Sequence, residues 1–488
     1  MQSWGRLIVI ALLLTAFSCG EFLDEQPFSQ TSDAQFWQSN QDAESGIAAI
    51  YDAMQETYRV NHFLWGEMRS DNLIASDRVS VDYEQLVTNN LTQANPVSRW
   101  NNLYQMIGRA NLAIEKIPQI PNYNPNLLGQ AKILRAYAYF DAIRVWGDVP
   151  LYTEAVKGLD QDLLLPRMSA QTIMEDIVLP DMLEAEELIT TSGNEFRFGR
   201  ASVWAFQASV YMHRQEWAKA KVSLDNIIAL NDYELVTDRD SWSELFLNDF
   251  ELGTFQEGPE LIFSIRYDIL EDGNRASGVW ELTFAGIPSF FVSPTLQNKW
   301  IQKFPLDSAQ WVQKYPDAPA PGTNEDGSNL YGDWRYYESI EPDRDIGFSR
   351  PSKYVKLNYS PQDDDTNIPV YRYSGVLLDK AIVENRLGNR EVALELINRI
   401  REARQLPTVE ADELVDLDMD AMEKFILDER QLEMFMEGDR WWTLRATERA
   451  IEVLDTITPL TEEELLFPIY ERHLIDNPNL TQNAAYVQ

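Results

Sequence analysis

The sequence predicts a mainly α-helical fold, built on tetratricopeptide-like helical hairpins with a loop-rich insertion. Apolar residues recur at helical spacing over 33–233 and again over 369–488, whereas 234–368 is rich in proline, glycine and asparagine. Two alanine pairs, each twelve positions apart, flank two turns: Ala208 and Ala220, and Ala381 and Ala393. Small residues at that separation let antiparallel helices pack closely, which is typical of helical repeats.

The chain begins with a segment that we interpret as a signal peptide, residues 1–18. Its apolar run is too short to span a bilayer. The single cysteine, Cys19, follows in a context that resembles a bacterial lipoprotein box, although Ala16 stands where leucine is usual. We expect acyl chains on Cys19, with 19–32 as a tether that anchors the protein without spanning the membrane. The alternative is an ordinary cleavage site with a chance cysteine.

The helical pattern divides the remaining chain into three regions. An N-terminal helical region covers 33–233, the insertion covers 234–368, and 369–488 forms a C-terminal helical hairpin with an extended tail. Proline or glycine ends several of the expected helices. We expect helices over 100–117, 129–146, 169–188, 202–230 with a break near Gln215, 371–404 and 420–445, and β-like runs over 260–265 and 353–357.

Composition excludes several classes of function. Lys and Arg number 41 against 78 Asp and Glu, which gives a net charge of −37. Such a chain has no basic stripe with which to bind nucleic acid. One cysteine and three separated histidines predict neither a disulfide nor a zinc site. We predict no cofactor, although acidic turns leave calcium open.

Aromatic residues are more informative than any catalytic motif. Neither a nucleophile elbow nor a phosphate-binding loop is present, and acid pairs are expected by chance among 78 carboxylates. The 14 Trp, 21 Tyr and 21 Phe include many in loop-like segments. Exposed rings offer flat apolar faces on which sugar rings can stack. The alternative is that each ring fills the core beneath a loop.

Three segments together resemble a known family. Residues 134–151 contain Leu-Arg-Ala-Tyr-Ala-Tyr-Phe and Arg-Val-Trp-Gly-Asp-Val-Pro-Leu, residues 429–445 contain Glu-Arg and Glu-Gly-Asp-Arg-Trp-Trp-Thr-Leu-Arg, and 477–483 read Asn-Pro-Asn-Leu-Thr-Gln-Asn. Their order and spacing are similar to those of the SusD/RagB glycan-binding lipoproteins of Bacteroidetes. The resemblance covers nearly the whole chain, with Thr443 where the family has aspartate.

The resemblance implies a SusD-like fold and a non-catalytic role. Such proteins bind oligosaccharides at the cell surface and deliver them to a SusC-like TonB-dependent transporter in the outer membrane. The negative net charge favours a neutral glucan, and the β-1,3-glucan laminarin is our specific hypothesis, unless a local basic patch exists.

The resemblance also implies a ligand site made by the loops 58–78 and 273–294. The tryptophans there would stack on sugars, and the polar residues would bind hydroxyl groups. Asp71 and Asn72 are alternative hydroxyl partners, and Trp311 and Trp334 are secondary stacking candidates. The expected ligand residues are Asn61, Trp65, Asp77, Arg78 and Trp280.

The family signature itself predicts structure rather than ligand contact. We expect a buried cluster of ion pairs and aromatic rings that holds the last helices to the scaffold. Its expected members are Glu429, Arg430, Arg440, Trp441 and Trp442.

Two other functions stay open. Helical repeats often serve as protein-interaction scaffolds without a glycan site of their own. A glycoside hydrolase of helical build is the second alternative, and release of reducing ends would identify it.

Overall fold

The computed structural model describes residues 36–487, apart from 157, 159–160, 249–255, 274–275, 284–287, 343–347, 356–359, 361, 363 and 415–416. The expected signal peptide, the tether and Cys19 lie outside the described residues. Within those residues, no helix has the length and apolar character needed to cross a bilayer.

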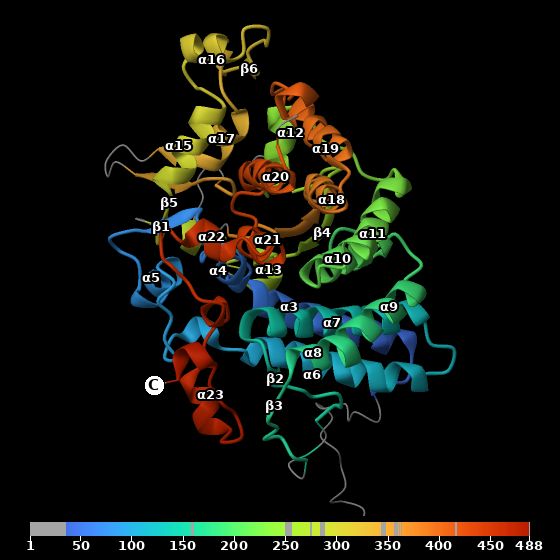
Figure 1. The fold of residues 1–488 in the computed structure, drawn as a ribbon. Coiled ribbons are helices and arrows are strands. Elements are labelled where there is room, and N and C mark those ends of the chain that lie inside the picture. Colours follow the sequence, from blue (N-terminus) through green and yellow to red (C-terminus); the bar gives the residue numbers. More distant parts are fainter. Residues whose placement is uncertain are drawn as a thin grey trace, which may run out of the picture.

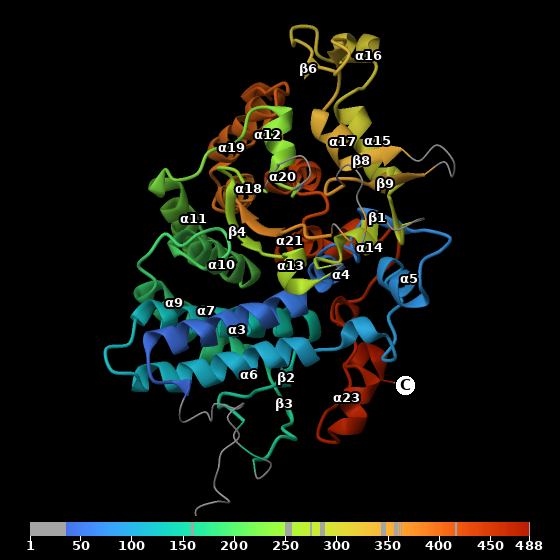
Figure 2. The same ribbon diagram turned by 180° about the vertical axis from the view of Figure 1, so that it is seen from behind.

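Four helices form a layer at the lower end of the molecule (Figures 1 and 2). They are α3 (Asn40–Tyr58), α6 (Asn101–Lys116), α7 (Pro125–Trp146) and α9 (Leu179–Leu188), and neighbouring helices pack side by side. Because α7 carries apolar residues on all of its faces, it is buried on almost all sides. The Asn124 side chain accepts the Asn126 N–H at its start, and Gly147, with φ of 74°, ends it.

Two helical hairpins continue from this layer. They are α10 (Arg200–His213) with α11 (Trp217–Leu230), and α18 (Tyr373–Arg386) with α19 (Arg390–Ala403), and α11 packs against α18. The four alanines of the internal repeat are fully buried, as close helix packing requires. The predicted mainly α-helical, tetratricopeptide-like fold is confirmed.

The segment 234–368 carries more regular structure than its composition suggested. Its strands form antiparallel pairs, two of them with strands that lie wholly or mostly outside the segment: β5 (Phe290–Val292) with β1 (Leu73–Ala75) and β4 (Leu261–Ile265) with β10 (Ile368–Arg372). The other pairs are β6 (Gly322–Thr323) with β7 (Asn329–Leu330) and β8 (Ile340–Pro342) with β9 (Ser349–Pro351). The strand expected over 260–265 is confirmed. The run expected at 353–357 is wrong for Lys353 and Tyr354, which form a turn, and 356–357 lie outside the described residues. Its helices are α12 (Arg239–Glu244), α13 (Ile269–Asp272), α14 (Val279–Thr283), α15 (Pro294–Lys303), α16 (Ser308–Lys314) and α17 (Trp334–Ser339).

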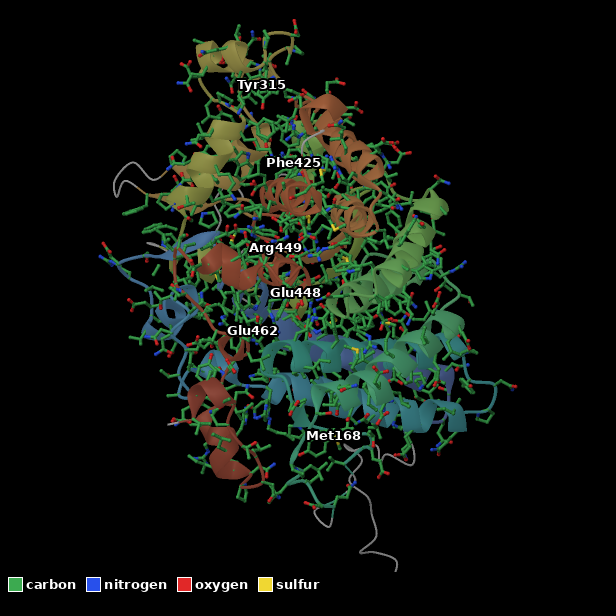
Figure 3. All side chains as sticks on the ribbon, in the orientation of Figure 1. Met168, Tyr315, Phe425, Glu448, Arg449 and Glu462 are labelled. Carbon is green, nitrogen blue, oxygen red and sulfur yellow. The ribbon has the colours of Figure 1, made fainter. Side chains whose placement is uncertain are left out.

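The remaining elements complete the two ends of the molecule. Figure 3 places Tyr315, directly after α16, at the opposite end from Met168 in β3. The tail expected to be extended contains the short helix α23 (Glu471–Asp476). The other elements are α4 (Asn61–Gly66), α5 (Val81–Val87), β2 (Val149–Pro150) paired with β3 (Arg167–Met168), α8 (Ala170–Ile173), α20 (Met419–Glu433), α21 (Arg440–Ala446) and α22 (Ala450–Leu454).

Charged side chains from distant segments meet in the interior and form what we name the central ion network. Each has at most 17% of its side chain exposed. Among the described residues its members are the cations Lys303, Arg335, Lys353, Arg372, Arg401 and Arg404 and the carboxylates Glu260, Asp333, Glu429, Glu433 and Glu437.

Glu433 on α20 lies at the centre of this network. Its carboxylate accepts hydrogen bonds from Arg335 at 2.6 Å, Arg372 at 2.6 Å and Arg404 at 2.7 Å. These arginines come from α17, from β10 and from the residue after α19. Although burial raises the pKa of Glu433, the three positive charges bring it well below its usual value. The Glu433 carboxylate on α20 therefore joins α17 of the insertion to β10 and to the end of α19.

Four of the five signature residues, Glu429, Arg430, Arg440 and Trp441, are buried beside this network, as predicted, whereas Trp442 is half-buried. Glu429 and Trp441 are fully buried, and Arg430 pairs with Asp439 at 2.8 Å. The hydroxyl of Thr443 accepts from Arg430 and donates to Asp439, both at 2.9 Å. Where the family has aspartate, this chain has Thr443. The carboxylate that pairs with Arg430 comes from Asp439 instead, and the Thr443 hydroxyl bridges these two side chains.

Replacing Glu433 by Gln should lower the free energy of unfolding by roughly 3–5 kcal/mol, because three buried guanidinium groups lose their shared charge partner. Wild-type stability from Glu433 is present above its ordinary pKa near 4.5 and is lost as the pH falls. Urea unfolding at pH 7 measures the change. Asp476→Asn, in an ion pair whose two side chains are more than half exposed, is the control and should change little. Equal effects of both variants would contradict the role of the network.

Two glycines allow α4 to approach the turn between α20 and α21. A Cβ on Gly66 would lie 1.9 Å from the carbonyl oxygen of Gly438. Gly438 has φ of 69°, and a Cβ there would lie 2.5 Å from the His62 ring. The glycine of the Glu-Gly-Asp-Arg signature is thus required by a close backbone contact.

Glu67, directly after α4, also contacts the turn between α20 and α21. Within the described residues, its carboxylate forms no ion pair. Its Oε1 accepts from Asn72 at 2.6 Å and from the Met436 N–H at 3.0 Å, whereas Oε2 has no partner among the described residues. Burial raises the pKa of Glu67 to about 7. The folded protein therefore keeps a proton that the unfolded chain releases near pH 4.5.

The variant Glu67→Gln tests whether the Glu67 side chain holds a proton in the folded protein. In the wild type, the contribution of Glu67 to stability falls as the pH rises from about 4.5 to 7. The amide mimics the protonated acid, so the variant should be more stable than wild type at pH 8 by roughly 3 kcal/mol, and no more stable near pH 4.5. Thermal unfolding across pH measures the difference, with exposed Glu471→Gln as control. A constant difference at all pH values would contradict the assignment.

Candidate functional site

The pairing of β1 with β5 brings the two predicted loops together. Leu73 pairs with Val292 and Ala75 with Phe290, and the Ser76 N–H donates to the Ser289 carbonyl at 3.1 Å. The loop after β1, which carries the exposed residues Asp77 and Arg78, therefore begins beside the segment 288–289. We name the surface formed by 76–83, α14, β5, Phe348 and β9 the loop face.

Half-exposed rings accompany these polar residues on the loop face. Trp280 on α14 is half-buried, and its backbone N–H donates to Asp364 at 3.2 Å. Tyr83 packs against Phe290, with ring centres 5.5 Å apart. Burial, and then the negative charge of neighbouring Glu281, raise the pKa of Tyr83 to about 12. The Tyr83 ring therefore lies near the start of α14.

Phe348 is an aromatic residue that the sequence analysis missed. It is 43% exposed and stacks on Phe291, with ring centres 5.2 Å apart and planes 9° apart. It comes directly before β9, which packs against β5. No local sequence pattern around Phe348 predicts that its ring is partly exposed and stacked on Phe291, because the stack depends on strands that are distant in sequence.

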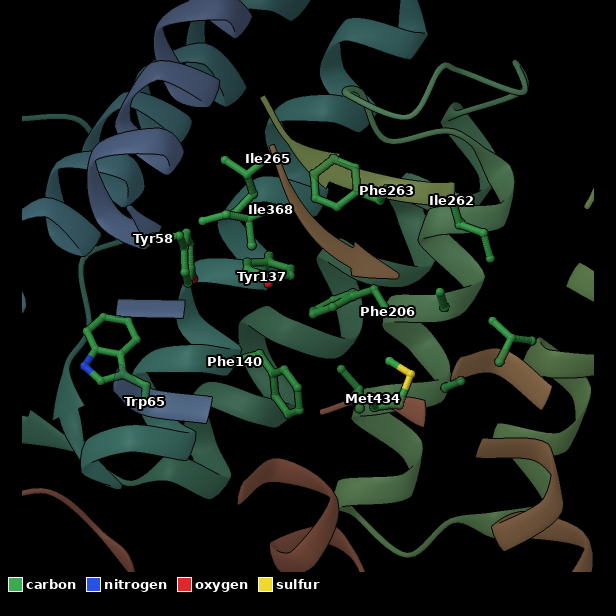
Figure 4. Close-up of a cluster of buried hydrophobic side chains, with 14 of the residues drawn as sticks. Tyr58, Trp65, Tyr137, Phe140, Phe206, Ile262, Phe263, Ile265, Ile368 and Met434 are labelled. Atoms are coloured by element: carbon green, nitrogen blue, oxygen red, sulfur yellow. The ribbon is translucent and has the colours of Figure 1, made fainter. Parts of the chain in front are cut away.

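Trp65 does not belong to the loop face, and its prediction as a surface stacking ring is wrong. Its side chain is 2% exposed, and its Nε1 donates to the Val97 carbonyl at 3.2 Å. The ring packs edge-on against Tyr58 and Trp146. Figure 4 shows Trp65 within the cluster of buried side chains. Because α4 turns this ring inward, it stabilises the core.

The secondary stacking candidates and the alternative hydroxyl partners are also buried. Trp311 and Trp334 are each 1% exposed, so neither can stack on a surface sugar. Asp71 pairs with Arg440 at 2.9 Å, and Asn72 accepts from Gln431 at 2.7 Å. Asp71 and Asn72 directly precede β1, so these bonds attach the loop face to the C-terminal helices.

Asn61 lies apart from the loop face. Its side chain donates to the Thr57 carbonyl at 2.8 Å and lines a cavity of about 90 Å³ between the lower helical layer and the C-terminal helices. That volume holds a few water molecules. Of the five predicted ligand residues, Asp77, Arg78 and Trp280 thus remain candidates on the loop face, Asn61 faces the cavity, and Trp65 is excluded.

The described residues do not gather a metal site. No group of three or more His, Cys, Asp or Glu side chains within 36–487, apart from the undescribed gaps, is placed to hold a metal ion.

Two sequence profiles match this chain. One, described as "SusD family", matches residues 299–446, and one, described as "Starch-binding associating with outer membrane", matches residues 21–212. The first contains the whole signature segment 429–445, and the second contains β1 and the loop after it.

Similar proteins cover the whole chain. SusD-like protein P38 of Formosa agariphila is 48% identical over 505 residues, with 100% of each chain covered. SusD-like protein P25 of the same organism is 24% identical, with 99% of each chain covered. NanU of Bacteroides fragilis has a similar fold, with a TM-score of 0.72 at 21% identity over 95% of this chain and 100% of its own. A SusD-like protein from Bacteroides fragilis gives 0.72 at 19% identity, over 92% and 98%.

The fold, the buried signature and these matches agree. The chain belongs to the SusD-like family, whose members bind carbohydrate and associate with the outer membrane.

Proposed function

We propose that this protein is a cell-surface lipoprotein that binds oligosaccharides on its loop face and delivers them to a SusC-like TonB-dependent transporter. The observation that carries the proposal is the pairing of β1 with β5, because it brings the loop of Asp77 and Arg78 to residues 288–289 of the second predicted loop, 273–294, which carries Trp280. Membership of the SusD-like family supports the same role. The protein is a binding component and not an enzyme in this proposal.

The chemistry of the loop face suits a neutral sugar. The rings of Trp280 and Phe348 offer apolar faces for sugar C–H groups. The carboxylate of Asp77 accepts from hydroxyl groups, and the guanidinium of Arg78 donates to them. Asp77 and Arg78 cancel each other's charge, and Asp82 and Glu281 on the same face disfavour a polyanion, so a neutral glucan fits, with the β-1,3-glucan laminarin as first choice. Because binding must order a flexible glycan, we expect dissociation constants on the order of 10⁻⁶ M or higher.

Alanine variants on the loop face test the proposal. Trp280→Ala, and the double variant Asp77→Ala with Arg78→Ala, should each weaken laminarin binding by about tenfold or more, which corresponds to about 1.4 kcal/mol. Calorimetry and affinity gels with laminarin, other neutral glucans and alginate measure binding. Preference for alginate, a polyuronate, would overturn the choice of a neutral glucan.

The chain offers matched controls at distant positions. Trp217→Ala on α11 removes another half-buried ring, and Arg472→Ala with Asp476→Ala removes an exposed ion pair on α23. Both should bind glycan as wild type does. If the loop-face variants also retain glycan but lose the transporter on co-purification, the protein is an interaction scaffold, and the glycan site proposed here is wrong.

A lipid on Cys19 would anchor the protein to the membrane. Cys19→Ala should move the protein from the membrane fraction to the soluble fraction, because the acylated thiol is lost. Fractionation followed by mass spectrometry of the N-terminal peptide measures the change. Ser18→Ala keeps the thiol and is the control. An unacylated Cys19 in the wild type would contradict the anchor.

A further inference from the structure

Arg59, the residue directly after α3, packs against the segment that carries Trp280. A Cβ on Gly278 would lie 3.3 Å from the Arg59 Cγ and 3.4 Å from the Arg59 carbonyl oxygen, so the two segments approach closely. Gly278 directly precedes α14, the helix of Trp280. One turn before Arg59, the Gln55 carbonyl accepts from the hydroxyl of Tyr267, which lies just before α13, at 2.9 Å. Figure 2 accordingly shows α13 and α14 near the end of α3.

The Arg59 guanidinium has no partner among the described residues. No carboxylate oxygen lies within 4.0 Å of it, and none of its nitrogens forms a hydrogen bond with the described part of the chain. Nε is enclosed, whereas the half-buried side chain leaves Nη1 and Nη2 in reach of solvent. With 78 Asp and Glu against 41 Lys and Arg, the chain could readily have supplied a carboxylate here. Two charged donors are therefore left for a ligand.

The electrostatic surroundings of Arg59 agree with a place on the loop face. Burial, and then the negative charges of Glu281 and Asp82, raise the pKa of Tyr83, and the positive charge of Arg59 opposes them. Tyr83 belongs to the loop face, as does α14, which carries Glu281. The charge of Arg59 thus acts on the same surface against which its stem packs at Gly278.

The contact with Gly278 also prepares the Arg59 side chain for binding. Its stem is packed and its Nε is enclosed, so the guanidinium has fewer conformations to lose than that of a free surface arginine. A guanidinium is planar and presents its N–H donors in a fixed geometry. Nη1 and Nη2 can therefore bind two neighbouring oxygen atoms of one ligand.

We propose that Arg59 is a ligand residue of the loop face, whose guanidinium binds two neighbouring oxygen atoms of the sugar that stacks on Trp280. This inference rests on the glycan binding proposed above, and it names a residue that neither the sequence patterns nor the family resemblance indicated. Stacking on a flat ring leaves a sugar free to rotate on that ring. The paired hydrogen bonds from Arg59 fix the orientation, so Arg59 selects a sugar by the positions of its hydroxyl groups. Asp82 and Glu281 on the same face disfavour an acidic sugar.

Substitutions of Arg59 test the proposal by calorimetry with laminarin. Arg59→Gln should raise the dissociation constant about tenfold, because the charged donor pair is lost. Arg59→Lys keeps the charge and most of the stem, but an ammonium lacks the paired geometry of a guanidinium, so this variant should raise the constant about fivefold. Arg399→Gln on α19 is the control and should bind as wild type does, because Arg399 also has no carboxylate partner within the described residues. Thermal unfolding checks that each variant is folded.

Trp280→Ala separates this inference from the proposed function. If Trp280→Ala weakens laminarin binding while Arg59→Gln or Arg59→Lys binds as wild type does, glycan binding on the loop face stands and the role of Arg59 is wrong. If neither Trp280→Ala nor Arg59→Gln changes binding, both proposals fall. An effect of Arg59→Gln on alginate alone would overturn the contact with sugar hydroxyl groups.

A second measurement on the wild type stands independently of whether the Arg59 variants fold. Phenylglyoxal modifies accessible arginines, and peptide mass spectrometry follows Arg59, Arg78 and Arg399 separately. Saturating laminarin should slow modification of Arg59 at least several-fold and leave Arg399 unchanged. Protection of Arg78 without protection of Arg59 would refute the role of Arg59 and leave the proposed function intact.

Discussion

The buried carboxylate of Glu433 is the contact on which the rest of this structure depends. Three guanidinium groups from separate segments converge on it, and each would be costly to bury alone. The interaction is directional, because Arg–carboxylate hydrogen bonds fix both distance and orientation. It therefore sets where α20 lies relative to the insertion, beyond what apolar packing alone would determine.

A continuous set of contacts links the position of α20 to the loop face at the surface. The turn after α20 meets α4 at Gly438 and Gly66, and α21 begins with Arg440, which holds Asp71. Asp71 lies two residues before β1, and β1 pairs with β5. The loop face is thus supported by rigid elements, as a binding site needs if little entropy is to be lost on binding.

The distribution of charge also follows from this arrangement. The central ion network buries cations and carboxylates in nearly equal number, so the acid excess of the chain is left at the surface.

The helices, their hairpins and the buried signature were predictable from the sequence, because helical periodicity, small-residue spacing and caps are local patterns. The resemblance to the SusD/RagB proteins, together with these patterns, indicated Asp77 and Arg78 as polar loop residues. They did not separate Trp65 from Trp280, since both tryptophans follow loop-like segments and only packing decides which ring turns inward. They also missed Phe348, whose position depends on β9 lying against β5. Local sequence determined which elements form, whereas contacts between distant segments decided which side chains face solvent, because burial is a property of the assembled chain.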